Sequence, residues 1–149
     1  MGFNVCIAGA TGNVGRTMIK ILEERNFPVD RLRLLASSRS VGKTLAYRGE
    51  EITVEELTLD SFEKGEIVLS SPGGAVSKWY APSAAKAGAL VIDNTSAFRM
   101  EKNVPLIVPE VNPEDAFLHE GIIANPNCST IQMVVVLKPL HDAARIKRV

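Results

Sequence analysis

The chain has 149 residues, enough for one ordinary domain, and its hydrophobic (46%) and charged (23%) fractions are those of a soluble globular protein rather than a disordered one. Its 17 basic and 17 acidic residues cancel, so charge gives no reason to expect a nucleic-acid or anionic-membrane partner. No apolar stretch approaches the ~20 residues of a membrane span and the N-terminus does not resemble a signal peptide, so we expect a cytoplasmic protein.

The first elements alternate between strand and helix, which predicts a parallel sheet built from βαβ units. Residues 3–8 form one apolar run of strand length, and residues 31–37 form a second. Residues 14–25 lie between them and predict an amphipathic helix. Its apolar positions at helical spacing are Val14, Met18, Ile21 and Leu22.

The alternation continues along the rest of the chain. Short strands are expected at residues 52–54 and 57–59, where apolar and polar residues alternate. The later expected elements are a buried strand at 66–71, an alanine-rich helix at 77–87 that closes at Gly88, strands at 90–93 and 121–124, a helix from about Ile131, and the beginning of a strand at 146–149.

Three glycines at three-residue intervals, Gly9, Gly12 and Gly15, follow the first strand and open the first helix. Glycine allows the tight turn, and its missing side chain lets the backbone approach a pyrophosphate at the helix N-terminus. A plain tight turn is the alternative. The strand and helix on either side favour a dinucleotide site.

The end of the second strand indicates which dinucleotide binds. NAD-specific sites usually carry Asp or Glu there, about 20 residues past the glycines. Here the strand ends in Ser37-Ser38-Arg39-Ser40, and Arg39 can grip a 2′-phosphate with paired charge-assisted hydrogen bonds. A solvated basic loop is the alternative, but we predict NADP rather than NAD.

The two cysteines have different surroundings. Cys6 lies in an apolar run and is expected to be an inert core residue. Cys128 follows Asn125-Pro126-Asn127, where Pro126 disfavours helix, and would lie in the first turn of the helix that comes next. The helix dipole favours a thiolate there, which suits covalent acyl transfer. A cysteine that caps a buried helix is the alternative.

The histidines and cysteines do not have the spacing of metal ligands, so no metal site is expected. His119 lies in a segment that reads as a surface turn, and His141 lies about 20 Å along the expected helix from Cys128. We expect both histidines to be structural or solvated rather than catalytic bases.

Four segments together resemble aspartate-semialdehyde dehydrogenases, in the family's order and spacing over the whole chain. They are Gly9-Ala10-Thr11-Gly12-Asn13-Val14-Gly15, Ser38-Arg39-Ser40, Asp93-Asn94-Thr95-Ser96-Ala97-Phe98-Arg99 and Asn125-Pro126-Asn127-Cys128-Ser129-Thr130. The last two are highly specific. N-acetyl-γ-glutamyl-phosphate reductases share the glycine turn and a catalytic cysteine but differ in both later segments. Pro72 departs from the small residue that relatives often carry before the paired glycines.

The resemblance implies an α/β fold of Rossmann type, with a mostly parallel sheet and helices on both faces. It also implies NADPH-dependent reductive dephosphorylation of L-aspartyl-4-phosphate to aspartate semialdehyde through a thioester on Cys128, a step toward lysine, threonine, methionine and diaminopimelate. It assigns substrate or phosphate binding to Arg99 and Asn127. It assigns cofactor binding to Gly9, Thr11, Gly12, Asn13, Val14, Arg39, Ser40 and Gly73.

The resemblance further implies a division of the chain. Residues 1–127 are expected to form an NADP-binding domain, and residues 128–149 the beginning of a truncated catalytic and dimerisation domain. Family members are longer, and that second domain holds their acid/base histidine and most of the homodimer interface. We therefore expect cofactor binding with little or no turnover. An N-acetyl-γ-glutamyl-phosphate reductase-like enzyme and a non-catalytic NADP-binding module remain as alternatives.

Overall fold

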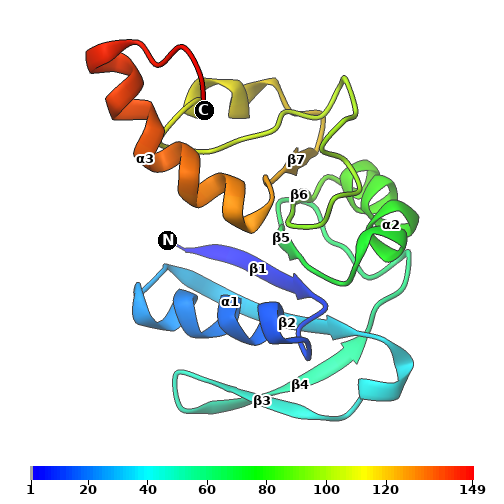
Figure 1. Ribbon diagram of the computed structural model, residues 1–149. Coiled ribbons are helices and arrows are strands. Elements are labelled where there is room, and N and C mark those ends of the chain that lie inside the picture. Colours follow the sequence, from blue (N-terminus) through cyan, green and yellow to red (C-terminus); the bar gives the residue numbers. More distant parts are fainter. Residues whose placement is uncertain (1) are drawn as a thin grey trace.

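The computed structural model describes residues 2–149, which form a seven-stranded sheet with helices packed on it (Figure 1). The strand order is β3-β4-β2-β1-β5-β6-β7, and all neighbouring pairs are parallel except the β3–β4 hairpin. The elements are β1 (Phe3–Ala8), α1 (Asn13–Glu24), β2 (Val29–Ala36), η1 (Ser38–Ser40), β3 (Thr44–Tyr47), β4 (Glu50–Glu56), β5 (Ile67–Ser70), α2 (Gly74–Ala87), β6 (Leu90–Asp93), η2 (Pro113–Leu118), β7 (Ile122–Ala124) and α3 (Cys128–Ala144). The predicted Rossmann-type sheet is confirmed.

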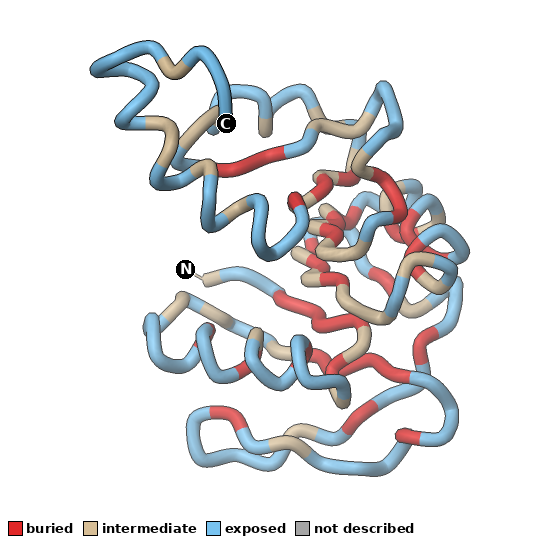
Figure 2. The backbone as a smooth tube through the Cα atoms, viewed as in Figure 1, coloured by how far each residue is buried: buried red, intermediate tan, exposed pale blue. Residues whose placement is uncertain are grey.

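Strand β1 shows how the sheet separates two apolar layers. Successive side chains of a strand point to opposite faces. Val5 and Ile7 pack in one cluster with the buried residues of α1, whereas Cys6 and Ala8 pack in the other with those of α2. Helices therefore cover both faces of the sheet, as predicted, and Figure 2 shows the buried backbone concentrated in the strands between them.

The buried face of α1 agrees in part with the predicted one, because Leu22 is buried and Met18 packs against the same core cluster. Gly15, Ile19 and Leu22 are buried, whereas Val14 and Ile21 are 43% and 40% exposed. The buried face is thus centred about one position away from the predicted apolar spacing. The glycine turn causes this, because the backbone at Gly15 packs so closely against the turn that a Cβ atom there would overlap it.

The segment that follows β4 is not the strand expected at residues 57–59. Leu57 is buried, and its N–H donates to the carbonyl of Ala36 at 2.8 Å, so it makes the last contact with β2. The N–H of Thr58 donates instead to Oγ of Ser61 at 2.9 Å, which starts a turn. The expected strand at residues 52–54 is confirmed as part of β4.

Both later helices are longer than predicted. α2 begins at Gly74, and it ends as expected at Gly88, whose φ of 91° is a left-handed cap. α3 continues through Pro139 to Ala144. Residues 146–149 form no strand, so the expectation of a strand there is wrong.

None of the residues of α3 is buried, and Figure 2 shows the helix in exposed and intermediate colours along its length. Its exposed side chains include Met133, Val136 and Leu140. The sheet and its two flanking helices therefore form the packed core, and α3 lies at its margin (Figure 1).

Candidate cofactor and active site

The loops that carry the predicted site residues gather at one edge of the sheet. Parallel strands have their carboxyl ends at the same edge, so the loops after β1, β2, β5, β6 and β7 lie there together. The chain passes from β1 to β2 on one side and later to β5 on the other. Such a reversal of strand order is the usual position of a ligand crevice in open α/β sheets.

The three glycines of the first loop have different physical reasons. Gly9 has a φ of +85°, and a Cβ atom there would lie 2.9 Å from the backbone of Pro72 in the loop after β5. Gly15 allows the close packing of α1 on the turn described above. Gly12 has an ordinary φ of −74°, and a Cβ atom there would meet only the carbonyl oxygen of Gly9, at 3.4 Å. The absence of a side chain at Gly12 is therefore not required for packing, and it leaves open space in front of the backbone.

That space belongs to a cleft of about 550 Å³, formed by the loops after β1, β2 and β5, the end of β4 and one side of α2. Its lining residues are Gly9, Thr11, Gly12, Ala36, Ser37, Ser38, Arg39, Glu56, Leu57, Ser71, Pro72, Val76 and Trp79. An extended dinucleotide needs a bare backbone for its phosphates and an apolar surface for its adenine, and this cleft has both. The residues fit a dinucleotide.

Four of the eight predicted cofactor residues line this cleft: Gly9, Thr11, Gly12 and Arg39. Asn13 and Val14 are exposed in the first turn of α1, and Gly73, with a φ of +100°, follows the lining residue Pro72. Ser40 is buried, and its Oγ accepts a hydrogen bond from Oγ1 of Thr11 at 3.4 Å.

Sequence reasoning did not identify the cleft residues Glu56, Leu57, Val76 and Trp79. Trp79 is 51% exposed, which is unusual for so large an apolar side chain, and it lies on α2 shortly after the paired glycines. A tryptophan in the second turn of a helix that follows a glycine loop is a local signal that could have suggested the cleft.

Cys128 is the first residue of α3, and its side chain is exposed. Asn127 caps the helix: its Oδ1 accepts hydrogen bonds from the N–H of Ser129 at 3.0 Å and from the Ser129 hydroxyl at 2.9 Å. The Cys128 thiol also lies 3.9 Å from this oxygen. The predicted first-turn position is confirmed, and within residues 2–149 Cys128 does not cap a buried helix, because none of the residues of α3 is buried.

Arg99 joins the loop after β6 to the loop that leads to Cys128. Its Nε donates to the carbonyl of Asn125 at 2.9 Å, and its Nη2 donates to the carbonyl of Asn94 at 3.2 Å. The side chains of Asn94 and Asn125 are hydrogen-bonded to each other as well. Arg99 has no carboxylate partner within residues 2–149, so it is not part of a surface ion pair.

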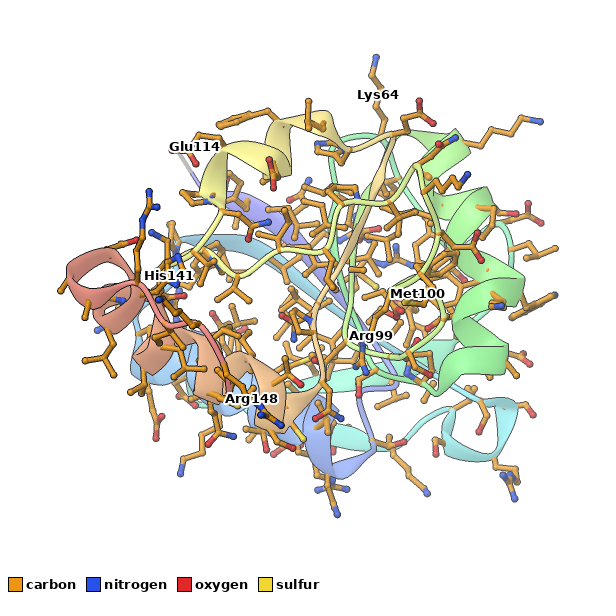
Figure 3. The ribbon with its side chains drawn as sticks, turned by 45° about the horizontal axis from the view of Figure 1, so that its top comes forward. Lys64, Arg99, Met100, Glu114, His141 and Arg148 are labelled. Atoms are coloured by element: carbon orange, nitrogen blue, oxygen red, sulfur yellow. The ribbon has the colours of Figure 1, made fainter. Side chains whose placement is uncertain are left out.

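Cys6 and the two histidines lie away from this site. Cys6 is fully buried, and burial, followed by the carboxylate of Glu66, raises the pKa of its thiol above the ordinary value. Nδ1 of His119 accepts the N–H of Gly121 at 2.9 Å, which gives this side chain a structural contact. His141 is exposed on α3, and Figure 3 shows it well apart from Arg99.

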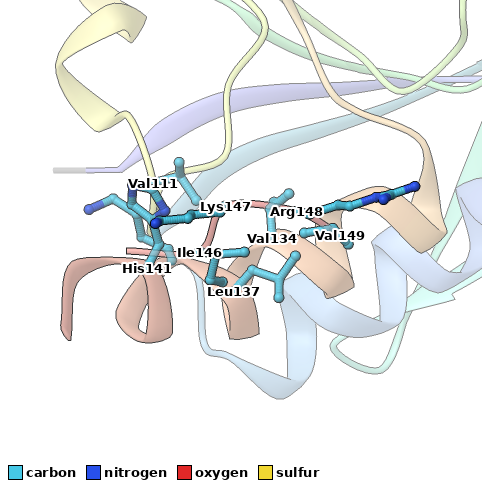
Figure 4. Close-up of a pocket in the computed structure, with 9 residues that line it drawn as sticks. Val111, Val134, Leu137, His141, Ile146, Lys147, Arg148 and Val149 are labelled. Atoms are coloured by element: carbon cyan, nitrogen blue, oxygen red, sulfur yellow. The ribbon is translucent and has the colours of Figure 1, made fainter. Parts of the chain in front are cut away.

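A second cavity, of about 370 Å³, lies between α3 and the C-terminal residues (Figure 4). Val134, Leu137 and residues 146–149 supply much of its lining. The cavity contains none of the residues predicted for the site and shares no lining residue with the cleft, although Val111, from the segment between β6 and η2, contributes to it. It is therefore separate from the cleft.

Two further findings concern the described part of the chain. Residues 2–149 contain no group of three or more His, Cys, Asp or Glu side chains placed to hold a metal ion. Within the same residues, no helix combines the length and the apolar character that crossing a bilayer would require.

Residues 4–119 match the family model described as semialdehyde dehydrogenase, NAD binding domain. The chain belongs to the semialdehyde dehydrogenase family. The match includes the glycine turn and the loop that carries Arg99, and it identifies the domain as a binder of nicotinamide dinucleotide. Cys128 lies beyond the matched residues, so its comparison rests on individual relatives.

Those relatives match 97–100% of the chain. The aspartate-semialdehyde dehydrogenase of Aquifex aeolicus is 62% identical over 152 residues, which are 100% of this chain and 45% of that protein. The crystal structure of Vibrio cholerae aspartate semialdehyde dehydrogenase II complexed with ASA has 52% identity and a TM-score of 0.92 over 99% of this chain and 49% of its own. The Candida albicans enzyme with NADP has 30% identity and a TM-score of 0.80, covering 97% and 48%. The chain thus spans less than half the length of these relatives.

Proposed function

We propose that the chain forms the cofactor-binding part of an NADPH-dependent aspartate-semialdehyde dehydrogenase, which converts L-aspartyl-4-phosphate to L-aspartate 4-semialdehyde and phosphate. The observation that carries the proposal is the exposed Cys128 thiol in the first turn of α3, at the sheet edge that also holds the glycine cleft. The substrate follows from relatives of up to 62% identity that bear this enzyme's name, which favours it over an N-acetylglutamyl phosphate reductase.

Cys128 acts as the nucleophile. Its side chain is exposed at the start of α3, so the sulfur is accessible to a substrate. The sulfur attacks the acyl carbon, the bond from that carbon to the phosphate oxygen breaks, and phosphate leaves with the electron pair. A nicotinamide in the cleft would supply the hydride that reduces the resulting thioester. The thiohemiacetal then collapses, its carbon–sulfur bond breaks, and the aldehyde and the thiolate are released.

Two neighbours of Cys128 bind and orient the substrate. Arg99 uses Nε and Nη2 to hold backbone carbonyls, which leaves Nη1 to donate to phosphate oxygens. Asn127 uses Oδ1 as the helix cap, so its Nδ2 is the group that donates to substrate oxygens. Both side chains are fixed by these bonds before substrate arrives, which reduces the entropy lost on binding.

NADP binds along the cleft. The backbone from Thr11 to Val14, including Gly12 and Asn13, donates N–H groups to the pyrophosphate at the start of α1. Arg39 holds the 2′-phosphate, and Ser40 supports that loop through its bond with Thr11.

The two ends of the cofactor take different surfaces. Leu57 and Trp79 provide the apolar wall for the adenine. Gly73 follows Pro72, on the side of the cleft that leads toward the loops after β6 and β7, and borders the nicotinamide. The adenosine thus lies near β4 and the reacting ring lies toward Cys128.

Residues 1–127 form the NADP-binding domain, and α3 begins a catalytic and dimerisation domain. A helix as apolar as α3 normally packs against other parts of a protein, yet none of its residues is buried. In the full-length enzyme a second domain and a homodimer partner pack against it and supply the acid/base histidine, and the enzyme works in the cytoplasm. The 149-residue chain alone binds NADPH and turns over little or no substrate.

Site-resolved alkylation tests the role of Cys128. Iodoacetamide at pH 7.5, with mass spectrometry of the two cysteine peptides, should modify Cys128 severalfold faster in the folded chain than in urea. Exposure alone would give equal rates, so the comparison isolates the effect of the helix start. Cys6 should react only in urea, because it is buried.

Cys128→Ser is the matched control, since it leaves Cys6 as the sole thiol and removes no buried contact. It should bind NADPH like the parent chain. If folding did not accelerate the reaction of Cys128, a non-catalytic nucleotide-binding module would describe the chain better. If the 149-residue chain reduced NADP at the rate of a full-length relative, given aspartate semialdehyde and phosphate, the need for a second domain would be refuted.

A further inference from the structure

The carboxylate of Asp93, the last residue of β6, is fully buried and surrounded by hydroxyl groups. Its Oδ1 accepts hydrogen bonds from Ser70 at 2.7 Å and from Ser77 at 2.8 Å. Its Oδ2 accepts one from Thr95 at 2.6 Å. Asp93 has no cationic partner within residues 2–149, so these three hydroxyls are what compensates its burial.

The two bonds to Oδ1 hold the cofactor side of the site. Ser70 ends β5 and immediately precedes the cleft residues Ser71 and Pro72. Ser77 lies in the first turn of α2, and its N–H donates to the carbonyl of Gly73 at 2.9 Å. The segment between them includes the left-handed Gly73, so Oδ1 fixes both ends of the loop that borders the cofactor cleft.

The bond to Oδ2 holds the substrate side. Oγ1 of Thr95 donates to Asp93 and accepts the N–H of Ala97 at 3.1 Å, which folds the loop after β6 into a turn. That turn leads to Arg99, whose guanidinium returns to the carbonyls of Asn94 and Asn125. The backbone carbonyl of Asp93 also accepts the N–H of Asn125 at 2.8 Å. The loop before Cys128 is therefore tied to the same residue.

The geometry points to Asp93 as a positioning residue that sets the cofactor loop through Oδ1 and the Arg99 loop through Oδ2. This inference rests on the proposed function, because it takes the first loop to bind NADPH and the second to bind phosphate. Asp93 itself touches neither ligand. Because the two carboxylate oxygens hold different loops, removing a hydroxyl partner of Oδ1 and removing the partner of Oδ2 should weaken the binding of different ligands.

Thr95→Val removes the Oδ2 bond and keeps the side-chain shape. It should raise at least fivefold the concentration of inorganic phosphate that half-protects Cys128 from iodoacetamide, while the NADPH dissociation constant stays within twofold. Ser77→Ala removes one Oδ1 bond. It should raise the NADPH dissociation constant at least fivefold and leave phosphate protection within twofold. Fluorescence titration measures the first quantity and peptide mass spectrometry the second, both on the 149-residue chain.

Two control variants separate positioning from general loss of structure. Thr95→Ser keeps the hydroxyl and should restore phosphate protection. Ser83→Ala changes a half-buried serine elsewhere on α2 and should alter neither measurement. Urea unfolding of each variant gives its stability.

The outcomes are distinct. The assignment is supported if Thr95→Val loses only phosphate protection and Ser77→Ala loses only NADPH affinity. Equal losses of both functions in both variants, in proportion to lost stability, overturn it, and so does the absence of any loss. A parent chain that neither binds NADPH nor shows protection of Cys128 by phosphate overturns the proposed function and the inference with it.

Discussion

Substituting Gly12 with Ala tests whether the glycine turn binds the cofactor pyrophosphate or is only a tight turn. The backbone of Gly12, with φ −74° and ψ 166°, is one that alanine adopts freely. The added Cβ would have only the carbonyl oxygen of Gly9 near it, at 3.4 Å. Alanine has less conformational freedom than glycine in the unfolded chain, which stabilises the variant by about 0.4–1 kcal/mol. Alanine is a poorer helix N-cap than glycine, which destabilises the variant by a similar amount. The free energy of unfolding should therefore change by less than about 1 kcal/mol.

Nucleotide affinity should respond much more strongly. The methyl group would project into the cleft, in front of the N–H groups that start α1. Losing one hydrogen bond to a charged pyrophosphate oxygen costs about 1.5–3 kcal/mol. The NADPH dissociation constant should thus rise roughly 10- to 100-fold, because each 1.4 kcal/mol is about a factor of ten. Fluorescence titration measures this change, and urea denaturation measures stability.

Gly9→Ala gives the contrasting result. Its φ of +85° and the Pro72 backbone, 2.9 Å from the added Cβ, make this variant less stable by at least about 1–2 kcal/mol. A Gly12→Ala chain that binds NADPH with parent affinity would refute pyrophosphate binding at this turn, and the three glycines would then be turn residues only.

Two further predictions concern charged side chains. Arg39→Gln should weaken NADPH binding roughly 10- to 100-fold and leave NADH binding unchanged, because only NADPH offers the 2′-phosphate; equal losses for both cofactors in parallel titrations would contradict NADP selectivity. Arg33→Met should cost about 3 kcal/mol at pH 7.5, because it strands the buried Glu66 carboxylate, 3.3 Å from Arg33. Burial raises the pKa of Glu66 above its unfolded value, so the ionised carboxylate destabilises the fold as pH rises. The loss of unfolding free energy caused by Arg33→Met should therefore be smaller at pH 5 than at pH 7.5. Urea unfolding at both pH values checks this, with Arg31→Met, which breaks an exposed pair with Glu63, expected to cost less than about 1 kcal/mol.

The elements that could be predicted from the sequence are those that depend on local pattern. Strands buried on both faces appear as apolar runs, and the glycine turn between β1 and α1 marks the strand edge. Cys6 and Cys128 could be told apart because one lies inside an apolar run and the other follows Pro126 at a helix start. These features need only a few neighbouring residues.

The features that sequence reasoning missed depend on distant residues. β4 pairs with β2 so that Glu56 lies opposite Ala36, which brings the end of β4 to the cleft. Nothing near residue 56 indicates that pairing. The buried face of α1 likewise follows from the packing of Gly15 on the turn, and not from the apolar spacing of Val14 and Ile21.

The choice between an enzyme and a nucleotide-binding module depends on Cys128 rather than on the fold. A module needs the glycine cleft, but it has no use for an exposed thiol at the first position of a helix. Within residues 2–149 stability does not explain that thiol either, since Asn127 caps α3 and the sulfur is exposed. The proposed nucleophilic chemistry would give this side chain a reason. The proposed anion-binding group, Arg99, is tied to the same segment, because it donates to the carbonyl of Asn125 in the loop that leads to Cys128.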